Sequence, residues 1–162
     1  DGNWYMQNSG SGFSAVHFGF NGDRPVAADF DGDGKTDVAV YRGNTWYVLG
    51  STSGFTGMQF GMVGDIPVQA DYDGDGKADY AVYRSGAWFI LGSQSGFQAN
   101  NFGMAGDTPV PADYDGDGKT DIAVYRPSST TWFMLKSSQS LNPGGGFASY
   151  SFGAAGDVLM NY

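Results

Sequence analysis

The chain has 162 residues, of which 41% are hydrophobic, 16% are aromatic and none is cysteine. This length suits a single domain with a hydrophobic core, and the absence of cysteine leaves no disulfide pattern from which to read a redox compartment. The formal net charge of −9 argues against nucleic acid as a partner, and no apolar run is long enough to span a membrane.

The first predicted strand lies near Trp4, in a partial unit at residues 1–22. After it, the first full repeat, residues 23–64, contains four short runs of strand-forming residues separated by turn residues. The loop between the first two runs is rich in aspartate and glycine, so we expect it to lie on a β-hairpin. The four strands are expected near residues 25–28, at 38–42, at 45–49 and near 55–60.

The same unit recurs with a period of 42 residues. The second and third repeats are residues 65–106 and 107–156, and a terminal strand is expected at 157–162, with no acidic loop behind it. The last repeat is longer than the others, and its residues 142–146 (Asn-Pro-Gly-Gly-Gly) predict a flexible surface loop. A fixed period of this length indicates a repeat architecture, which we place in one domain, residues 1–162.

Apolar residues occupy both faces of the predicted strands. Residues 38–41 read Val-Ala-Val-Tyr and residues 46–49 read Trp-Tyr-Val-Leu. A sheet with one wet face would alternate apolar with polar residues, so these strands must be covered on both sides. We therefore predict an all-β fold of about four repeats, each a β-propeller-type blade of four antiparallel strands packed between like neighbours.

The predicted hairpin loop reads Asp-aromatic-Asp-Gly-Asp-Gly-Lys-x-Asp and occurs three times, so that it holds 12 of the 17 acidic residues. Alternate residues of a tight loop direct their carboxylates inward, and the carbonyl of the lysine at position seven adds a further oxygen. Calcium prefers about six to eight oxygen ligands of this kind. The three predicted Ca²⁺ sites use Asp29, Asp31, Asp33, Lys35, Asp37, Asp71, Asp73, Asp75, Lys77, Asp79, Asp113, Asp115, Asp117, Lys119 and Asp121.

Other readings of this loop are weaker. Magnesium requires a stricter octahedron with more water, and zinc favours cysteine and clustered histidine, which the chain lacks. The EF-hand pattern fails because position twelve is Val40 and no helix flanks the loop. An Asp-Gly turn that binds nothing is the remaining alternative, but three copies of four crowded carboxylates would repel one another without a cation.

The unit resembles the FG-GAP and VCBS-type repeats of integrin-like β-propellers, particularly those of secreted bacterial proteins. The resemblance rests on residues 29–42, Asp-Phe-Asp-Gly-Asp-Gly-Lys-Thr-Asp-Val-Ala-Val-Tyr-Arg, and on the later pairs Phe60-Gly61 and Gly64-Asp65. It implies calcium at the hairpin loop, with the aspartates and lysine carbonyls named above as ligands. It also implies an extracellular bacterial setting, secreted or on the cell surface, and a ring of usually about seven blades, which is more than this chain provides.

Several repeated side chains have both a structural and a functional interpretation. The tryptophans could stack on sugars, but apolar neighbours on both strand faces favour a place in the core between blades, and the tyrosines are placed similarly. The repeated arginines are expected to pair with turn aspartates such as Asp65 and Asp107, and His17 is expected to be structural. The repeated residues are Trp4, Trp46, Trp88, Trp132, Tyr41, Tyr83, Tyr125, Arg42, Arg84 and Arg126.

An enzyme is not indicated, because the chain has no glutamate, no cysteine, one histidine and no nucleophile elbow. The sequence favours a non-enzymatic, calcium-binding extracellular scaffold for adhesion, structure or protein recognition. A carbohydrate-binding module that uses blade-edge aromatics is the alternative, and an accessory domain of a larger hydrolase is the third candidate. Because an incomplete ring exposes strand edges, we expect a homo-oligomer or filament, or a part of a longer chain.

Overall fold

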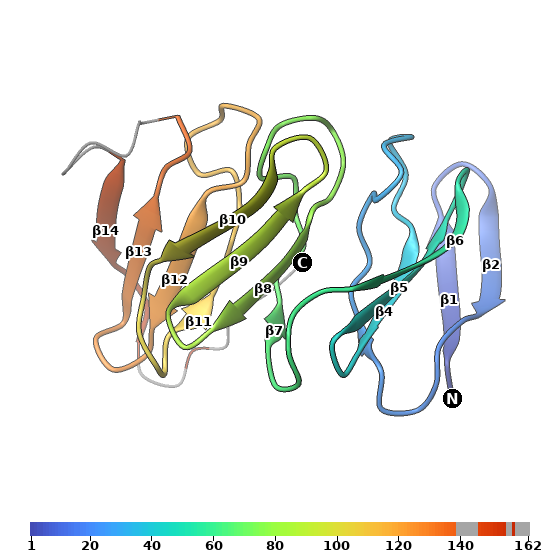
Figure 1. Ribbon diagram of the computed structural model, residues 1–162, viewed down its shortest axis with the longest axis horizontal. Helices are drawn as coiled ribbons and strands as arrows, with labels where there is room; N and C mark the ends of the chain where they lie inside the picture. Colours follow the sequence, from blue (N-terminus) through green and yellow to red (C-terminus); the bar gives the residue numbers. More distant parts are fainter. Residues whose placement is uncertain (139–145, 155–156, 158–162) are drawn as a thin grey trace.

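Antiparallel sheets make up the part of the chain that the computed structural model describes, which is residues 1–138, 146–154 and 157. A two-stranded sheet at one end is followed by three four-stranded sheets, arranged side by side in chain order (Figure 1). In these residues there is no helix long and apolar enough to cross a membrane.

Each four-stranded sheet has the same simple topology, with neighbouring strands consecutive in the chain. The two-stranded sheet consists of β1 (Asn3–Asn8) and β2 (Gly12–His17). The first four-stranded sheet contains β3 (Arg24–Pro25), β4 (Val38–Arg42), β5 (Thr45–Gly50) and β6 (Gly54–Gln59). The second contains β7 (Ile66–Pro67), β8 (Tyr80–Arg84), β9 (Ala87–Gly92) and β10 (Gly96–Asn101). The third contains β11 (Thr108–Pro109), β12 (Ile122–Arg126), β13 (Thr131–Leu135) and β14 (Phe147–Ser151).

The predicted all-β fold with four-stranded antiparallel units is confirmed. The strands predicted at 38–42 and 45–49 appear as β4 and β5, and the partial first unit contributes β1 and β2. The first strand of each unit is shorter than expected, and beyond it pairing continues through isolated contacts. One of these is the hydrogen bond from Val26 N to the Ala39 carbonyl at 2.9 Å.

Two sequence-based expectations fall on residues that the structure leaves undescribed. The predicted surface loop at 142–146 lies outside the described residues except for Gly146. The predicted terminal strand at 157–162 is described only at Asp157.

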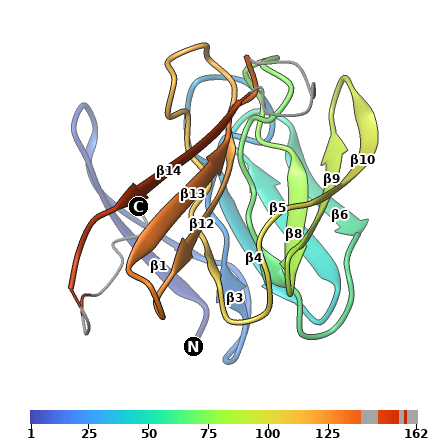
Figure 2. The same ribbon diagram turned by 90° about the vertical axis from the view of Figure 1, so that its left-hand side faces the viewer.

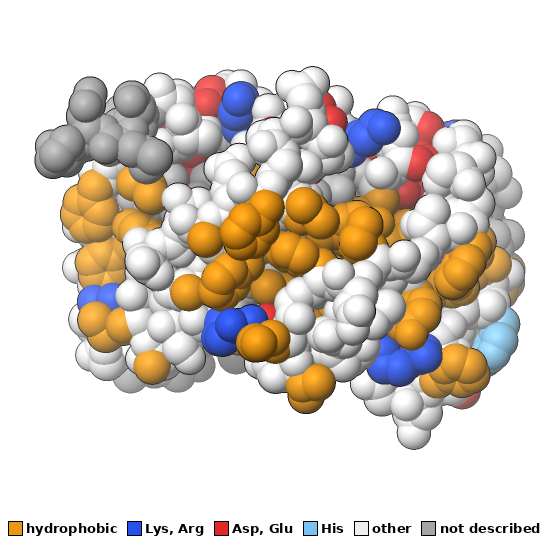
Figure 3. Space-filling view, in the orientation of Figure 1, with side chains coloured by type: hydrophobic (Ala, Val, Ile, Leu, Met, Phe, Trp, Pro, Cys, Tyr) orange, Lys and Arg blue, Asp and Glu red, His pale blue; other side chains and the backbone are white. Residues whose placement is uncertain are grey.

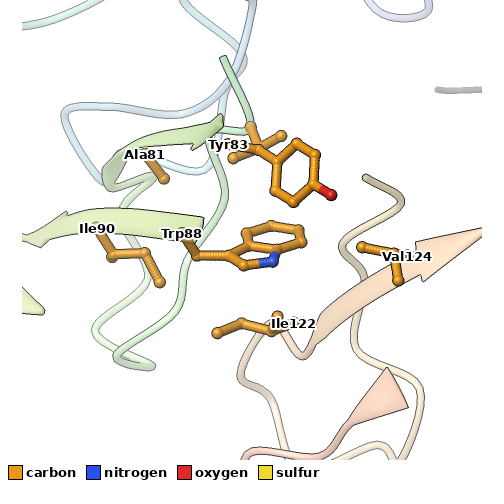
Figure 4. Packing of buried hydrophobic residues seen from close by; sticks show 7 residues of the cluster. Ala81, Tyr83, Trp88, Ile90, Ile122 and Val124 are labelled. Atoms are coloured by element: carbon orange, nitrogen blue, oxygen red, sulfur yellow. The ribbon is translucent and has the colours of Figure 1, made fainter. Parts of the chain in front are cut away.

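A tryptophan is buried at each junction between four-stranded sheets. Trp46 and Trp88 have no solvent-accessible surface. Figure 4 shows the Trp88 indole between Tyr83 of its own sheet and Ile122 and Val124 of the next sheet. The core therefore lies between the sheets, as predicted for these tryptophans and tyrosines.

The third sheet is the last of the stack among the described residues, and Figure 2 shows its strands β12, β13 and β14 facing the viewer. Its tryptophan, Trp132, is only half-buried, and so is Trp4 of the two-stranded sheet. Full burial of this side chain is thus found where its own sheet and the following sheet both have four strands.

The Phe-Gly pair ties each tryptophan to the loop that leaves its sheet. The indole Nε1 of Trp46 donates a hydrogen bond to the Phe60 carbonyl at 3.0 Å. Gly61 follows in the left-handed region, with φ at +101°, and a Cβ there would lie 2.7 Å from the Tyr41 hydroxyl. Only glycine fits this approach without displacing the tyrosine, which explains the pair as a packing requirement.

The repeated arginines form the ion pairs that the sequence predicts. Arg42 donates from Nε to Asp23 Oδ1 at 2.6 Å and from its terminal nitrogen to Oδ2 at 2.7 Å. This fork-like geometry recurs in the pairs Arg84–Asp65 and Arg126–Asp107. The aspartate side chain is at most 5% exposed in all three pairs, so each loop between sheets is anchored at a buried carboxylate.

Trp88→Ala is expected to lower the free energy of unfolding by about 3–5 kcal/mol, because it leaves a cavity at a closed junction. The matched substitution Trp132→Ala should cost clearly less, because its side chain is half-exposed in the described structure. Denaturant unfolding of both variants measures the difference. Equal losses in the free energy of unfolding would contradict the conclusion that the core lies between the sheets.

Arg42→Ala is expected to lower the free energy of unfolding near neutral pH by about 1–2 kcal/mol, since the Asp23 carboxylate loses its partner while solvent compensates in part. The hydrogen bonds from Arg42 lower the pKa of Asp23 below its ordinary value of 3.8. The pair therefore stabilises the fold above that value, and its contribution is lost as the pH falls through the folded-state pKa. Unfolding measured near neutral pH and in strong acid should show the effect of the substitution only in the first case.

Candidate metal centre

The three acidic loops lie at the same end of the sheets, each joining the first strand of its sheet to the second. Figure 3 shows the carboxylates and lysines gathered along the upper edge of the molecule, where these loops lie in Figure 1. In the first loop, an isolated bridge between Ala28 and Asp37 closes the hairpin. The loop is thus held at its base by the strands, and its carboxylates converge above that base.

The first aspartate of the loop holds the backbone turn. Asp29 Oδ1 accepts a hydrogen bond from Gly32 N at 2.7 Å, and its Oδ2 accepts one from Gly34 N at 2.8 Å. Both glycines lie in the left-handed region, with φ at +79° and +81°. The turn therefore places the later aspartates around the first one.

The last aspartate of the loop is buried and accepts several hydrogen bonds. Asp37 is 1% exposed and accepts hydrogen bonds from Phe30 N at 2.8 Å and Ser51 N at 2.7 Å. Its counterpart in the second loop is Asp79, whose pKa is raised by burial, although hydrogen bonds from Ser93 N and other donors oppose the shift. A buried carboxylate in this position gains from a cation placed beside it.

The second aspartate of the loop presents one oxygen that no donor satisfies. Oδ2 of Asp31 accepts hydrogen bonds from Thr52 N and Ser53 N, both at 2.9 Å, and these lower the pKa of Asp31 to about 2. Its Oδ1 is buried and has no hydrogen-bond partner in the described structure, and the same holds for Oδ1 of Asp73. A buried, ionised oxygen without a donor is the feature of these loops that points most directly to a cation.

The carboxylates of each loop come together within the reach of one ion. In each group three ligand oxygens lie within 4.8 Å of one another. The first group contains Asp29, Asp31 and Asp33. The second contains Asp71, Asp73 and Asp79, and the third contains Asp113, Asp115 and Asp121. All three predicted sites are thus represented, each by three of its four aspartates.

The remaining predicted ligands lie in the same loops. Asp75 and Asp117 occupy the position that Asp33 has in the first loop. Each of these three aspartates accepts one hydrogen bond from the backbone N–H of the lysine in its own loop and one from a serine hydroxyl. The Lys35 ammonium pairs with Asp33 at 2.9 Å, which raises the pKa of Lys35. That the carbonyls of Lys35, Lys77 and Lys119 act as ligands stays a prediction.

Sequence analysis missed the loop after the third strand, which supplies donors to the site. Ser51 donates from its hydroxyl to Asp33 at 2.7 Å, in addition to its N–H bond to Asp37. Ser93 and Ser137 make the equivalent contacts in the other sheets. The available signal was a serine five residues after every tryptophan of the full repeats.

Neighbouring loops contact one another along the stack. Ala78 N donates to the Asp29 carbonyl at 2.6 Å, and Thr120 N donates to the Asp71 carbonyl at 2.7 Å. The aliphatic part of Lys77 lies against Gly32, where a Cβ would come within 2.9 Å of it. Each loop therefore takes part in the junction with the next sheet as well as in its own site.

The third loop differs from the other two at one supporting position. Gly50 and Gly92 end the third strand of their sheets. A Cβ at either position would clash with a serine hydroxyl, that of Ser53 at Gly50 and that of Ser95 at Gly92. Lys136 occupies this position in the third sheet. There, Asp115 accepts a hydrogen bond from Ser138 Oγ at 2.5 Å. The third cluster is thus built with a different support.

The donor set of these loops consists of oxygen atoms only: carboxylates held by backbone N–H groups, with two buried oxygens left unsatisfied. Such a set fits a hard divalent cation of the calcium type. It offers no thiolate or imidazole for a soft metal.

Of three comparisons with known proteins, one found a match, which covers two parts of the chain. A search of the curated proteins and a search of the solved structures each found no match to the chain. The family model described as FG-GAP repeat matches residues 21–49 and 105–155, which contain the first and third acidic loops. The middle repeat carries the same acidic motif at residues 71–79. The two matches support the FG-GAP repeat family for this chain.

Proposed function

We propose that the chain is a calcium-binding, non-enzymatic scaffold of the extracellular space, whose metal ions hold the hairpin loops of its sheets. The observation that carries this proposal is the pair of buried, unsatisfied oxygens, Asp31 Oδ1 and Asp73 Oδ1, each inside a cluster of three carboxylates. Calcium would offset the repulsion within the clusters, and the aspartates with the lysine carbonyls would hold it. In these loops the ion is structural.

The family and the repetition of the sites support this reading. FG-GAP repeats are typical of extracellular or surface proteins and are typically non-enzymatic. Free calcium is high outside cells, where sites with dissociation constants of about 10⁻⁴–10⁻³ M are filled. Catalysis requires different groups in different roles, whereas these loops repeat one arrangement.

Calcium is expected to raise the melting temperature, and chelation with EDTA should reverse the rise, because an ion that binds only the folded state stabilises it by mass action. At a concentration of about 100 times the dissociation constant, each site would contribute about 2.7 kcal/mol. Asp31→Asn should reduce the calcium-dependent part of the rise, whereas the control Asp1→Asn, outside the loops, should leave it unchanged. A melting temperature that does not respond to calcium or EDTA would contradict the proposal.

If the chain is a carbohydrate-binding module, the sugar would have to stack on aromatic residues other than these tryptophans. Trp46 and Trp88 are fully buried and present no face to a sugar. Phe55 and Phe97 are each 62% exposed on the outer strands, where they meet Phe18 and Phe60 of the preceding sheets at centroid distances of 6.2 and 6.3 Å. A row of exposed rings at the rim suits a partner surface, whether protein or glycan.

We further propose self-association, for which the internal junctions provide the pattern. At an internal junction, one sheet presents its tryptophan to the next sheet. The next sheet contributes the residue that directly follows its own tryptophan, as Phe89 does in the cluster that contains Trp46. Tyr5 directly follows Trp4 in β1, is 69% exposed and stacks with Phe13 at a centroid distance of 6.5 Å. At the other end, the third sheet presents its half-buried tryptophan, Trp132. The two ends of the described stack are therefore complementary, and contact between copies would be head-to-tail.

Wild-type protein with calcium is expected to associate at micromolar concentration, as measured by light scattering after size-exclusion chromatography. Tyr5→Ser should weaken this association at least tenfold, because it removes the ring that faces the partner's tryptophan. Phe97→Ser removes a ring of similar exposure from the rim and serves as the control. A wild-type monomer under these conditions would rule the idea out.

A further inference from the structure

A groove of about 380 Å³ lies between the second and third four-stranded sheets. It is lined by β9 and β10 on one side and by the start of β12 and the end of β13 on the other, which stand side by side in Figure 1. Its floor is apolar and contains Ile90, Ile122 and Leu135. The volume is that of a small-ligand site, for which the usual range is about 300–1,000 Å³.

The two junctions differ at one packing position. At the preceding junction, Tyr80 stacks on Phe30 with 5.3 Å between ring centroids and meets Trp46 edge-on at 5.5 Å. The residue 42 positions later is Ile122, which lies beside Trp88 in Figure 4. Isoleucine lacks the aromatic ring that Tyr80 provides, and it lines the groove, whereas Trp88 itself is fully buried. Val38 holds this position in the first sheet, so an aliphatic residue occurs here in two of the three full sheets.

Two side chains on the β10 wall of the groove differ from those at the same positions of the preceding sheet. Gln98 stands 42 residues after Thr56, and Asn100 stands 42 residues after Met58. Both replacements introduce a carboxamide into a wall that borders an apolar floor. Gln98 is exposed and Asn100 is half-buried, so both carboxamides can reach a ligand in the groove.

Cationic side chains complete the groove. Lys136 stands four residues after the tryptophan of its sheet, the position that glycine occupies in the other two full sheets. Lys119 enters from the acidic loop of the third sheet. Among the described residues neither lysine forms an ion pair. Gln98 donates from Nε2 to Ser95 Oγ at 2.9 Å, which orients its amide and leaves its carbonyl oxygen available.

We propose that this groove binds an acidic saccharide, one uronate unit of a glycan. Carboxamides both donate and accept hydrogen bonds, so Gln98 and Asn100 suit the vicinal hydroxyls of a pyranose ring. Lys136 and Lys119 bind its carboxylate, and the C–H face of the ring lies on Leu135, the partly exposed apolar residue of the lining.

The neighbouring acidic loop does not oppose an anionic ligand at the groove. Asp73 lines both features, but its Oδ2 is occupied by hydrogen bonds from Gln94 N at 2.9 Å and Ser95 N at 2.8 Å. Its other oxygen is buried. The carboxylate therefore turns toward the loop, where the proposed calcium would neutralise it. The glycan site goes beyond the scaffold function and rests on it in part, because Asp73 and Lys119 belong both to the acidic loops and to the groove.

The test is titration of the calcium-containing protein with a hyaluronan tetrasaccharide, whose glucuronate units alternate with N-acetylglucosamine, followed by calorimetry and by NMR. Binding is expected, with shifts in the side-chain amide signals of Gln98 and Asn100. The neutral N-acetylglucosamine tetramer should bind at least tenfold more weakly, because it lacks the carboxylate.

Variants that restore the residue of the neighbouring repeat separate the groove from the fold. Ile122→Tyr refills the space as Tyr80 does, and Lys136→Gly restores the glycine of the other sheets; each should weaken binding at least tenfold. Arg24→Ala removes an exposed cation that lies outside the groove and the acidic loops, and it should leave binding unchanged. The calcium-dependent melting rise, measured on the same variants, distinguishes failure of the groove from failure of the metal sites.

Several outcomes would overturn the proposal. These are no binding of the acidic tetrasaccharide to folded wild-type protein, equal binding of the neutral tetramer, or NMR shifts confined to residues outside the groove. Binding of a tetraglutamate peptide at the same residues, without binding of the saccharide, would assign the groove to an acidic peptide and refute the glycan. The NMR mapping uses only the wild type, so it decides the matter even if a variant fails to fold.

Discussion

The structure depends on one constraint, that every sheet has two apolar faces and cannot bury either of them alone. Trp46 and Trp88 reach full burial only because the next sheet closes over them. Each sheet is therefore stabilised by its neighbours, as in other repeat architectures where stability is a sum of unit and interface terms. The Arg–Asp pairs add to this by fixing the loops that carry the chain from one sheet to the next. The end faces of such a stack keep the same demand for a partner.

The acidic loops are part of this stacking as well as candidate metal sites. The carboxylates are positioned by backbone N–H groups, and the Asp29 carbonyl accepts a hydrogen bond from Ala78 N of the next loop. Preorganised oxygens cost little further entropy when an ion binds. They also repel one another while no ion is present, so the proposed calcium would remove a destabilisation that this geometry carries. Binding at a loop would then act on the junction that the loop touches.

Much of this fold could be predicted from the sequence, because apolar residues on both faces of residues 38–42 permit few arrangements. The Arg42–Asp23 class of ion pair and the burial of Trp88 follow the repeat pattern in the same way. What the sequence could not supply are contacts between segments far apart in one repeat, such as the hydroxyl of Ser51 on Asp33. Spacing within a motif indicates which oxygens converge, whereas only the folded hairpins show that Asp31 keeps one of them unsatisfied.

Agreement and disagreement among the repeats carry different information. Where three copies share a residue, as at the loop aspartates, a structural demand common to all sheets is sufficient to explain it. Where one copy departs in several lining positions at once, a shared structural demand cannot explain the change. Gln98 and Asn100 stand where the preceding sheet has Thr56 and Met58, Lys136 stands where the other full sheets have glycine, and all three line one groove. These changes add hydrogen-bonding capacity and positive charge at one place, and they are the basis of the proposed ligand site.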